Sequence, residues 1–258
     1  MAARFVWYEL MTTDPAAASG FYGRVVGWSA KDSGLTDRSY TILSAGLSAG
    51  EVPVGGLMAI PPEVARAGAG PAWVGYIGVE DVDSVAQRLT AAGGTIHRAA
   101  EDIPNVGRFA VVSDPQGAHF VLFTGGPGEA PHQPAPEAPG HTGWHELHST
   151  DWESVFGFYS ELFGWTKAAT HDMGAMGVYQ LFAIDDVAVG GMMNQQKGVP
   201  HPFWLFYFNV AEIHDAAGRV TSNGGRILNG PMEVPGGSMI LHCADPQGAM
   251  FALVAPGH

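Results

Sequence analysis

One short pattern occurs twice in this chain. Residues 7–14 read WYELMTTD and residues 144–151 read WHELHSTD, so a tryptophan, a glutamate and an aspartate recur at identical spacing. An FY pair, a GW pair, a GG pair and a DPQG turn then follow in the same order in both copies. Fixed spacing within such blocks, with slippage between them, is typical of a duplicated folded unit. The chain is therefore predicted to contain two similar halves.

A proline-rich stretch separates the two copies. The segment GGPGEAPHQPAPEAPGH has no apolar periodicity, which is typical of a semi-rigid linker. We expect a first domain over residues 3–125, a linker over 126–140 and a second domain over 141–256. A chain of 258 residues is long enough for each domain to bury a core of its own.

Composition limits the partners and the location. Acidic residues outnumber basic ones 25 to 12, and the net charge of −13 disfavours binding to nucleic acid. The single cysteine, Cys243, excludes an internal disulfide and fits a reducing compartment. The opening residues MAARFVWYEL do not resemble a signal peptide, and no apolar run reaches the roughly 18 residues of a membrane span. We expect a cytoplasmic protein that contacts neither nucleic acid nor membrane, and the sequence is compatible with a homodimer.

Each half carries two copies of one pattern of strands and helices. The run FVWYELM is of strand type, and Asp14 followed by Pro15 predicts a helix from there to about Val26. In the second half the apolar residues from Val155 to Phe163 fall three or four apart, as on one buried helix face. Another strand, helix and set of short strands follow in both halves. The pattern is βαβββ twice in each half, which predicts an α+β fold.

These features together resemble the vicinal oxygen chelate superfamily. The features are paired βαβββ units, a strand ending in Asp before an FY-containing helix that closes with GW, and a DPQG turn before a last apolar strand. The superfamily includes glyoxalase I, bleomycin-resistance proteins and extradiol dioxygenases, and the likeness is strongest to tandem glyoxalase-like or hydroxylase-type proteins of actinobacteria. The resemblance implies that each half forms a curved, mostly antiparallel eight-stranded cup with its helices outside.

The same resemblance implies a divalent metal ion in each cup, held by His, Gln or Glu from the first and last strands of the units. Counting from the helix-opening acidic residues and from the DPQG turns places these ligands at residues that lack donor atoms. The residues are Trp7, Val74, Val121, Trp144, Leu205 and Ala252. The remaining ligand strand has carboxylates only at its entry, Glu51 and Asp186. We therefore expect no metal cofactor at the positions that the superfamily uses.

The tryptophans stand in the place of the first-strand ligands and offer an aromatic platform. Stacking on a planar ligand is worth roughly 0.5–1.5 kcal/mol beyond area burial, although Trp7 and Trp144 are equally compatible with core packing. Strand alternation puts Glu9 and Glu146 on the same face as these rings. A carboxylate there either stays solvated or paired with arginine, or takes part in binding.

Further polar candidates share the face that lies inside the cup. Tyr76 and Tyr207 have the right strand parity to hydrogen-bond the two glutamates, and His119 has the same parity on the last strand of its unit. The run HTGWHELH invites a metal-site hypothesis, but His145 is three residues from His148, so on a strand the two point to opposite faces.

Glu146 and His148 do share a face. With a third ligand they form a candidate site for a divalent ion such as Zn, Fe, Mn or Ni. The first half has Met11 at the position of His148, so at best one half binds metal.

Two functions follow. In the first, the protein binds a small aromatic or hydrophobic molecule in its cups without metal. In the second, it is a metal-dependent lyase, hydroxylase or dioxygenase with relocated ligands. The residues favour the first and the superfamily's many enzymes favour the second, so enzymatic activity stays open and no catalytic residue is assigned. The candidate ligand-binding residues are Trp7, Glu9, Tyr76, His119, Trp144, Glu146, His148 and Tyr207.

Overall fold

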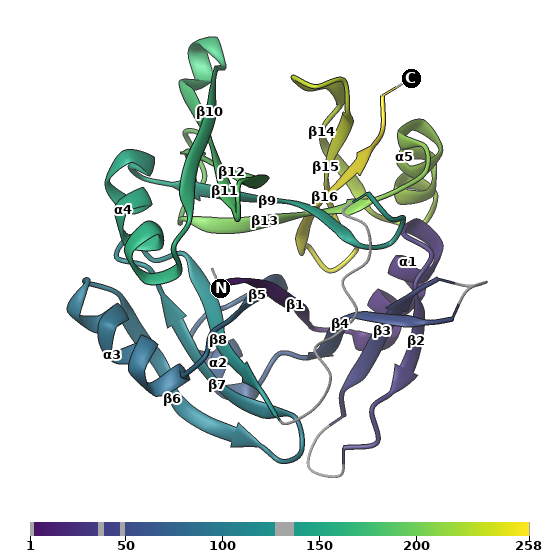
Figure 1. Cartoon of the computed structure of the whole chain (residues 1–258). Helices are drawn as coiled ribbons and strands as arrows, with labels where there is room; N and C mark the ends of the chain where they lie inside the picture. The colour runs from purple at the N-terminus through teal and green to yellow at the C-terminus, as the bar shows by residue number, and fades with distance from the viewer. Residues whose placement is uncertain (1–2, 36–38, 47–49, 127–136, 258) are drawn as a thin grey trace. The chain divides into compact units, whose positions relative to one another are not determined.

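The structure is a computed structural model (Figure 1). None of its described helices is long and apolar enough to cross a membrane. Residues 127–136 of the predicted linker lie outside the described residues. The described residues are 3–35, 39–46, 50–126 and 137–257.

The first half folds as two βαβββ modules joined through a short helix. Module 1 holds β1 to β4 with α1, and module 2 holds β5 to β8 with α3. The elements are β1 (Arg4–Thr12), α1 (Pro15–Val25), β2 (Ser29–Asp32), β3 (Thr41–Ala45), β4 (Val52–Ala59), α2 (Pro62–Arg66), β5 (Ala72–Gly78), α3 (Val82–Ala91), β6 (Thr95–Ile103), β7 (Gly107–Ser113) and β8 (His119–Gly125).

The second half repeats this order. Module 3 holds β9 to β12 with α4, and module 4 holds β13 to β16 with α5. The elements are β9 (Thr142–Ser149), α4 (Trp152–Phe163), β10 (Thr166–Asp172), the 3₁₀ helix η1 (Gly174–Met176), β11 (Val178–Ile184), β12 (Val187–Asn194), β13 (Phe203–Asn209), α5 (Ile213–Ser222), β14 (Arg226–Glu233), β15 (Met239–Ala244) and β16 (Met250–Ala255).

Each half contributes one eight-stranded sheet. The strand orders are β2-β3-β4-β1-β5-β8-β7-β6 and β10-β11-β12-β9-β13-β16-β15-β14. Within each module the first strand pairs in parallel with the last, and the remaining neighbours pair antiparallel. Neither strand order closes on itself among the described strands. The predicted α+β fold of duplicated βαβββ modules is confirmed.

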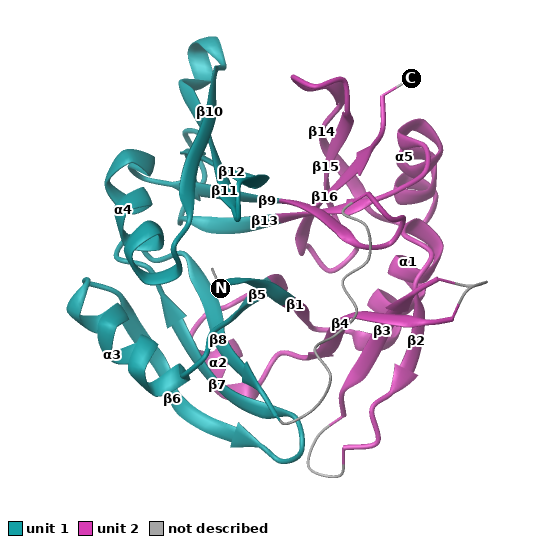
Figure 2. Ribbon diagram, in the orientation of Figure 1, with its two compact units in different colours: residues 1–6, 74–131, 145–205 teal, residues 7–73, 132–144, 206–258 magenta. Residues whose placement is uncertain are grey.

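The chain also divides into two compact units, which do not follow the two halves (Figure 2). Unit 1 holds most of module 2 and most of module 3, whereas unit 2 holds most of module 1 and most of module 4. The predicted domain limits stay a prediction. Unit 1 is residues 1–6, 74–131 and 145–205, and unit 2 is residues 7–73, 132–144 and 206–258.

The core of each unit lies where helices cover strands. In unit 1, Phe120 of β8 contacts Tyr159 and Phe163 of α4, with ring centroids 5.9 and 5.8 Å apart. In unit 2, Phe251 of β16 contacts Phe21 of α1 at 5.8 Å. Because successive strand residues point to opposite faces, the neighbours of these phenylalanines project away from the helices. The candidate site residues of β8 and β16 therefore belong to the opposite face.

The aspartates of the repeated pattern begin helices. Asp14 Oδ1 accepts a hydrogen bond from the Ala17 backbone N–H at 3.0 Å, and Asp151 Oδ1 accepts one from Ser154 at 3.3 Å. Such a cap satisfies a donor that the helix leaves unpaired and is worth about 1 kcal/mol. Gly164 ends α4 in the left-handed conformation, with φ of 75°. These repeated residues therefore serve the fold.

A buried chain of hydrogen bonds, here called the Trp–Tyr–Asp clamp, joins α4 to the DPQG turn before β8 in unit 1. Trp204 Nε1 donates to Tyr159 OH at 3.2 Å, and Tyr159 OH donates to Asp114 Oδ2 at 3.0 Å. Asp114 Oδ1 accepts from the backbone N–H groups of Gln116 and Ala118. Burial raises the pKa of the Asp114 carboxyl. The clamp fixes both the turn and the helix.

Unit 2 contains the same clamp. Trp73 Nε1 donates to Tyr22 OH at 2.8 Å, and Tyr22 OH donates to Asp245 Oδ2 at 3.2 Å. Asp245 Oδ1 accepts from the backbone N–H groups of Gln247 and Ala249. In both units the tyrosine comes from one half of the chain and the aspartate from the other. The FY pairs and DPQG turns of the repeat are thus explained by packing.

Candidate functional site

The two histidines of strand β9 project from opposite faces of the sheet, as the sequence predicts. His145 Nδ1 contacts the backbone oxygen of Val189 at 2.8 Å, and the ring stacks on Phe5 with centroids 4.5 Å apart. Burial lowers the pKa of His145 to about 4. His145 is therefore a neutral core residue, and the polar chemistry of β9 lies on the other face.

That other face carries three polar side chains in contact, here called the Glu146 cluster: Glu146, His148 and Tyr179. Glu146 is only 6% exposed. Its Oε2 accepts a hydrogen bond from Tyr179 OH at 2.8 Å, and its Oε1 lies 2.6 Å from His148 Nε2. A buried carboxylate requires such partners, because desolvation disfavours its charge. The structure thus brings Glu146 and His148 together and buries the glutamate.

His148 has unsatisfied hydrogen-bonding capacity. Its ring stacks on Phe203 at 4.6 Å between centroids and 2° between planes, and its side chain is 12% exposed. The contact of Nε2 with Glu146 is close, but it lacks hydrogen-bond geometry. Nδ1 is also buried without a hydrogen-bond partner among the described residues. Because buried polar atoms are normally paired, this imidazole is prepared for a further polar group.

The GG pair of the repeat makes room for Tyr179. Gly191 lies opposite Glu146 in the β9–β12 register. A Cβ atom at Gly191 would overlap the Tyr179 ring. Only glycine therefore lets this ring lie across the strand with its hydroxyl on the glutamate.

Module 1 has the same scaffold with different contacts. Gly56 lies opposite Glu9, and a Cβ atom there would overlap the hydroxyl of Tyr40. Tyr40 OH accepts a hydrogen bond from Trp7 Nε1 at 2.9 Å. Glu9 is 8% exposed, and Met11 replaces the histidine. The structure therefore buries both repeated glutamates, and it engages the first-half tryptophan in a polar contact.

The remaining predicted residues have other contacts or exposures. Tyr76 is buried and meets Phe123 edge-on at 6.1 Å. His119 is exposed, with its ring 4.4 Å from that of His97. Trp144 is half-buried. Hydrogen bonds from Tyr76 and Tyr207 to the two glutamates stay predictions.

Two residues that contact predicted site residues were not predicted from the sequence. Tyr179 had a signal, because a tyrosine precedes the GG pair in each half. The second residue, His242, has no such signal, because the first half has Val111 at that position. In the structure Tyr207 OH and His242 Nε2 lie 2.7 Å apart.

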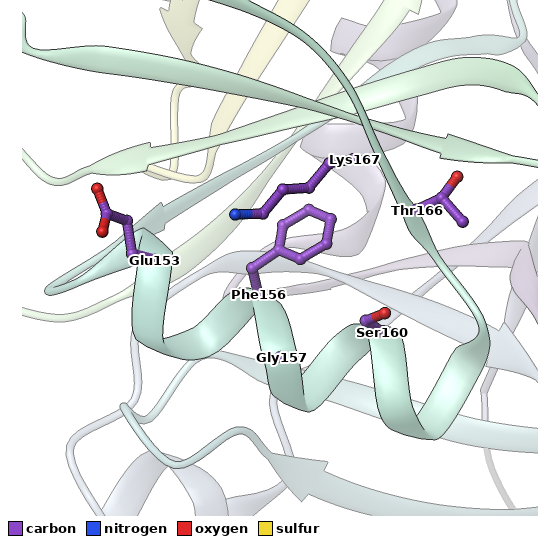
Figure 3. A pocket seen from close by; sticks show the side chains of 6 residues that line it. All are labelled: Glu153, Phe156, Gly157, Ser160, Thr166 and Lys167. Carbon is purple, nitrogen blue, oxygen red and sulfur yellow. The ribbon is translucent and has the colours of Figure 1, made fainter.

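A hollow lined by residues of α4 and of the start of β10 involves none of these candidates (Figure 3). Its floor includes Phe156, and Lys167 Nζ lies 5.2 Å from the centroid of that ring and 5.1 Å from that of Trp152. These cation–π contacts hold the lysine against the helix. The hollow is lined by Glu153, Phe156, Gly157, Ser160, Thr166 and Lys167.

The family comparison agrees with the module order. The model of the Glyoxalase/Bleomycin resistance protein/Dioxygenase superfamily matches residues 4–122 and 138–253. The chain belongs to this superfamily.

Relatives within the superfamily span nearly the whole chain. CFP32 of Mycobacterium tuberculosis, described as a candidate glyoxylase, is 31% identical over 254 residues, covering 97% of this chain and 94% of CFP32. The anthracycline biosynthesis protein DauV of Streptomyces sp. strain C5 is 30% identical over 257 residues, covering 96% of this chain and 91% of DauV.

Solved structures share the fold at low identity. The Mn(II)-bound glyoxalase from Novosphingobium aromaticivorans has a TM-score of 0.65 and 16% identity, covering 98% of this chain and 81% of that one. The 2,3-dioxygenase LapB from Pseudomonas sp. KL28 has a TM-score of 0.65 and 15% identity, covering 99% and 92%.

The superfamily's metal does not fit the residues carried over from its ligand positions. The side chains at those positions are tryptophan, valine, leucine and alanine, and none supplies a suitable donor. Glu51 and Asp186, at the strand entries, are exposed. Among the described residues no three or more His, Cys, Asp or Glu side chains gather as a metal site. Glu146 and His148 supply two donors, one fewer than the three protein ligands usual in catalytic zinc sites.

Proposed function

We propose that this superfamily member binds a small, planar aromatic or hydrophobic molecule against the sheet face that carries the Glu146 cluster. The observation that carries the proposal is the buried Glu146 carboxylate beside a stacked imidazole whose Nδ1 has no hydrogen-bond partner among the described residues. A ligand hydroxyl or carbonyl would complete the hydrogen bonding of His148. A mostly apolar site with a few well-placed polar groups is typical of small-molecule binding.

The tryptophans support an aromatic ligand. Trp7 and Trp144 stand where the superfamily places its first-strand metal ligands, and both are half-buried. Half-burial leaves ring surface for stacking, which a fully packed core tryptophan does not offer. In this proposal, stacking and hydrogen bonding take the place of metal coordination.

The relatives point to the same ligand class. DauV carries the name anthracycline biosynthesis protein, and the similarity to it covers 96% of this chain. Anthracyclines contain a planar, hydroxylated polycyclic ring system. A ligand of this kind offers both a flat surface for stacking and oxygen atoms for hydrogen bonding. The cytoplasmic location and any homodimer remain part of this proposal.

A second function has one observation in its favour. Glu146 Oε1 and His148 Nε2 lie 2.6 Å apart. A small rearrangement of the two side chains would let both atoms coordinate one divalent ion. In that case the protein would be a metal-dependent lyase, hydroxylase or dioxygenase with relocated ligands, and a third ligand would come from elsewhere.

Two measurements on the purified protein test the choice. Metal analysis of protein prepared anaerobically reports any bound Zn, Fe, Mn or Ni, and titration with 1,4-dihydroxyanthraquinone reports binding of a planar aromatic compound. We expect less than stoichiometric metal and saturable binding of the dye. Stoichiometric metal that is lost in Glu146→Gln, without dye binding, would instead support the metalloenzyme.

Two variants link binding to the cluster. His148→Met copies the first half, and we expect it to weaken dye binding about tenfold, because one hydrogen bond to a buried group is lost. Glu153→Gln is the matched control, since Glu153 is an exposed carboxylate of the same module. If His148→Met and Glu153→Gln bind the dye equally well, the Glu146 cluster is not part of the ligand-binding site.

A further inference from the structure

Module 4 carries a polar pair that the proposed function does not use. Tyr207 OH and His242 Nε2 are 2.7 Å apart. In the strand register Tyr207 lies opposite Ala252, and Ala252 lies opposite His242. Cross-strand partners project from the same face of a sheet, so all three side chains share one face. The hydroxyl and the imidazole thus meet beside a methyl group.

The Tyr207–His242 pair lies beside a position that the superfamily uses for a metal ligand. Ala252 is the position where the superfamily resemblance puts a last-strand carboxylate ligand, and alanine offers no donor atom. In module 2 the matching row is Tyr76, Val121 and Val111, aligned in the same register. The imidazole of His242 therefore belongs to the second half, as does that of His148. The two halves therefore differ on this face: the second half has His148 and His242 where the first half has Met11 and Val111.

The two partners differ in exposure. Tyr207 is 2% exposed, whereas His242 is half-buried. A ligand on this face therefore meets the imidazole, and the tyrosine lies behind it. A neutral imidazole has one donor and one acceptor nitrogen, and a tyrosine hydroxyl can serve either one. The contact to Tyr207 fixes the orientation of the ring, which makes Tyr207 a positioning residue.

We propose that His242, positioned by Tyr207, is a ligand-contacting residue that recognises an acidic hydroxyl, such as a phenol or enol, on a small aromatic molecule. The proposal takes its ligand class from the proposed function and adds the chemical group that is recognised. A neutral imidazole can accept a hydrogen bond from a phenol, and an imidazolium can donate one to a phenolate. An aromatic ring without hydroxyl groups cannot form this hydrogen bond, so His242 adds nothing to its affinity.

Paired probes separate recognition of the hydroxyl from recognition of the ring. Dissociation constants for 1,4-dihydroxyanthraquinone and for unsubstituted anthraquinone are measured with the full-length protein. In His242→Val, which copies the first half, we expect about tenfold weaker binding of the dihydroxy compound and a change within about twofold for anthraquinone. Val111→Ala, at the matching position of module 2, is the control and should keep the wild-type ratio.

Tyr207→Phe is the second variant. It keeps the ring and removes only the hydroxyl, so it should lower the ratio of the affinity for the dihydroxy compound to that for anthraquinone. Near-UV circular dichroism checks the fold of each variant, and if His242→Val does not fold, the Tyr207→Phe ratio decides. An unchanged ratio in the folded variants, or an equal loss for both probes, overturns the inference while leaving aromatic binding intact. Failure of the wild-type protein to bind either probe overturns the proposed function as well.

Discussion

Tyr159 donates a hydrogen bond of 3.0 Å to Asp114, and the two residues come from different halves of the chain. The bond is buried and ends on a carboxylate that already holds the DPQG turn. Removing the hydroxyl leaves one carboxylate oxygen without its donor. Leaving a buried acceptor unpaired costs about 1–3 kcal/mol.

We therefore expect Tyr159→Phe to lower the free energy of unfolding by about 1–3 kcal/mol, measured by urea denaturation. Tyr22→Phe, which removes the matching hydroxyl in unit 2, should lose a similar amount. A loss below about 0.5 kcal/mol in Tyr159→Phe, the range of ordinary surface substitutions, would show that the clamp adds no stability.

The pKa of the Asp114 carboxyl leads to a prediction about how stability depends on pH. Burial raises the pKa of Asp114 above its ordinary value of 3.8. The folded state therefore holds the proton more tightly than the unfolded state, so this group stabilises the fold increasingly as the pH falls toward 3.8. Its favourable contribution is lost as the pH rises through the pKa of the folded state.

Asp114→Asn removes this titration. The difference in unfolding free energy between wild type and Asp114→Asn should shift in favour of the wild type as the pH is lowered from neutral toward 3.8. Asp14→Asn, which changes an exposed helix cap, is the comparison. A wild-type advantage that shrinks on acidification would contradict the raised pKa.

Gly191→Ala tests the packing of Tyr179. The added Cβ overlaps the ring, so either the tyrosine leaves Glu146 or the strands separate, at a cost of about 1–3 kcal/mol. Gly157→Ala is the control, because nothing lies within 4 Å of a Cβ there and alanine is the better helix former. Chemical denaturation gives both values. Equal stability of the two variants would show that the ring does not depend on the glycine.

Trp144→Ala tests the aromatic platform. If the half-buried ring contacts ligand, this variant weakens binding of 1,4-dihydroxyanthraquinone more than it weakens the fold. Truncating a core tryptophan costs about 3–5 kcal/mol, and Trp165, with 0% exposure, provides that reference. Titration and thermal unfolding of both variants separate the outcomes. A Trp144→Ala protein that unfolds as easily as Trp165→Ala yet binds the dye normally would assign Trp144 to the core.

The fold was predictable because duplication displays each motif twice. Repeated capping aspartates and DPQG turns located α1, α4 and the last strand of each half. The sequence did not locate β2, whose residues SAKD are largely exposed and lack an apolar alternation. Nor did it locate α2, a five-residue helix whose N-cap residue makes no side-chain hydrogen bond. Short elements held by their neighbours carry little signal of their own.

The candidate site was predictable only along a single strand. Alternation on β9 placed Glu146 with His148 and separated both from His145, because side-chain period is a local property. Tyr179 and His242 come from other strands, and their contacts depend on register between segments far apart in sequence. One glycine sets the approach of Tyr179, and one alanine lies beside the His242 contact. Neither of these small residues indicates by itself which polar group lies above it.

The way in which the two halves share the compact units is informative about the origin of this duplicated chain. Each unit combines a module from one half of the chain with a module from the other half. Two identical half-length chains would build the same pair of units as a symmetric dimer, each lending a tyrosine to the other's DPQG turn. Duplication of that gene followed by fusion of the copies would then have released the halves from symmetry. A substitution such as methionine to histidine on β9 could afterwards arise once per molecule, so one half could specialise while its twin kept the scaffold.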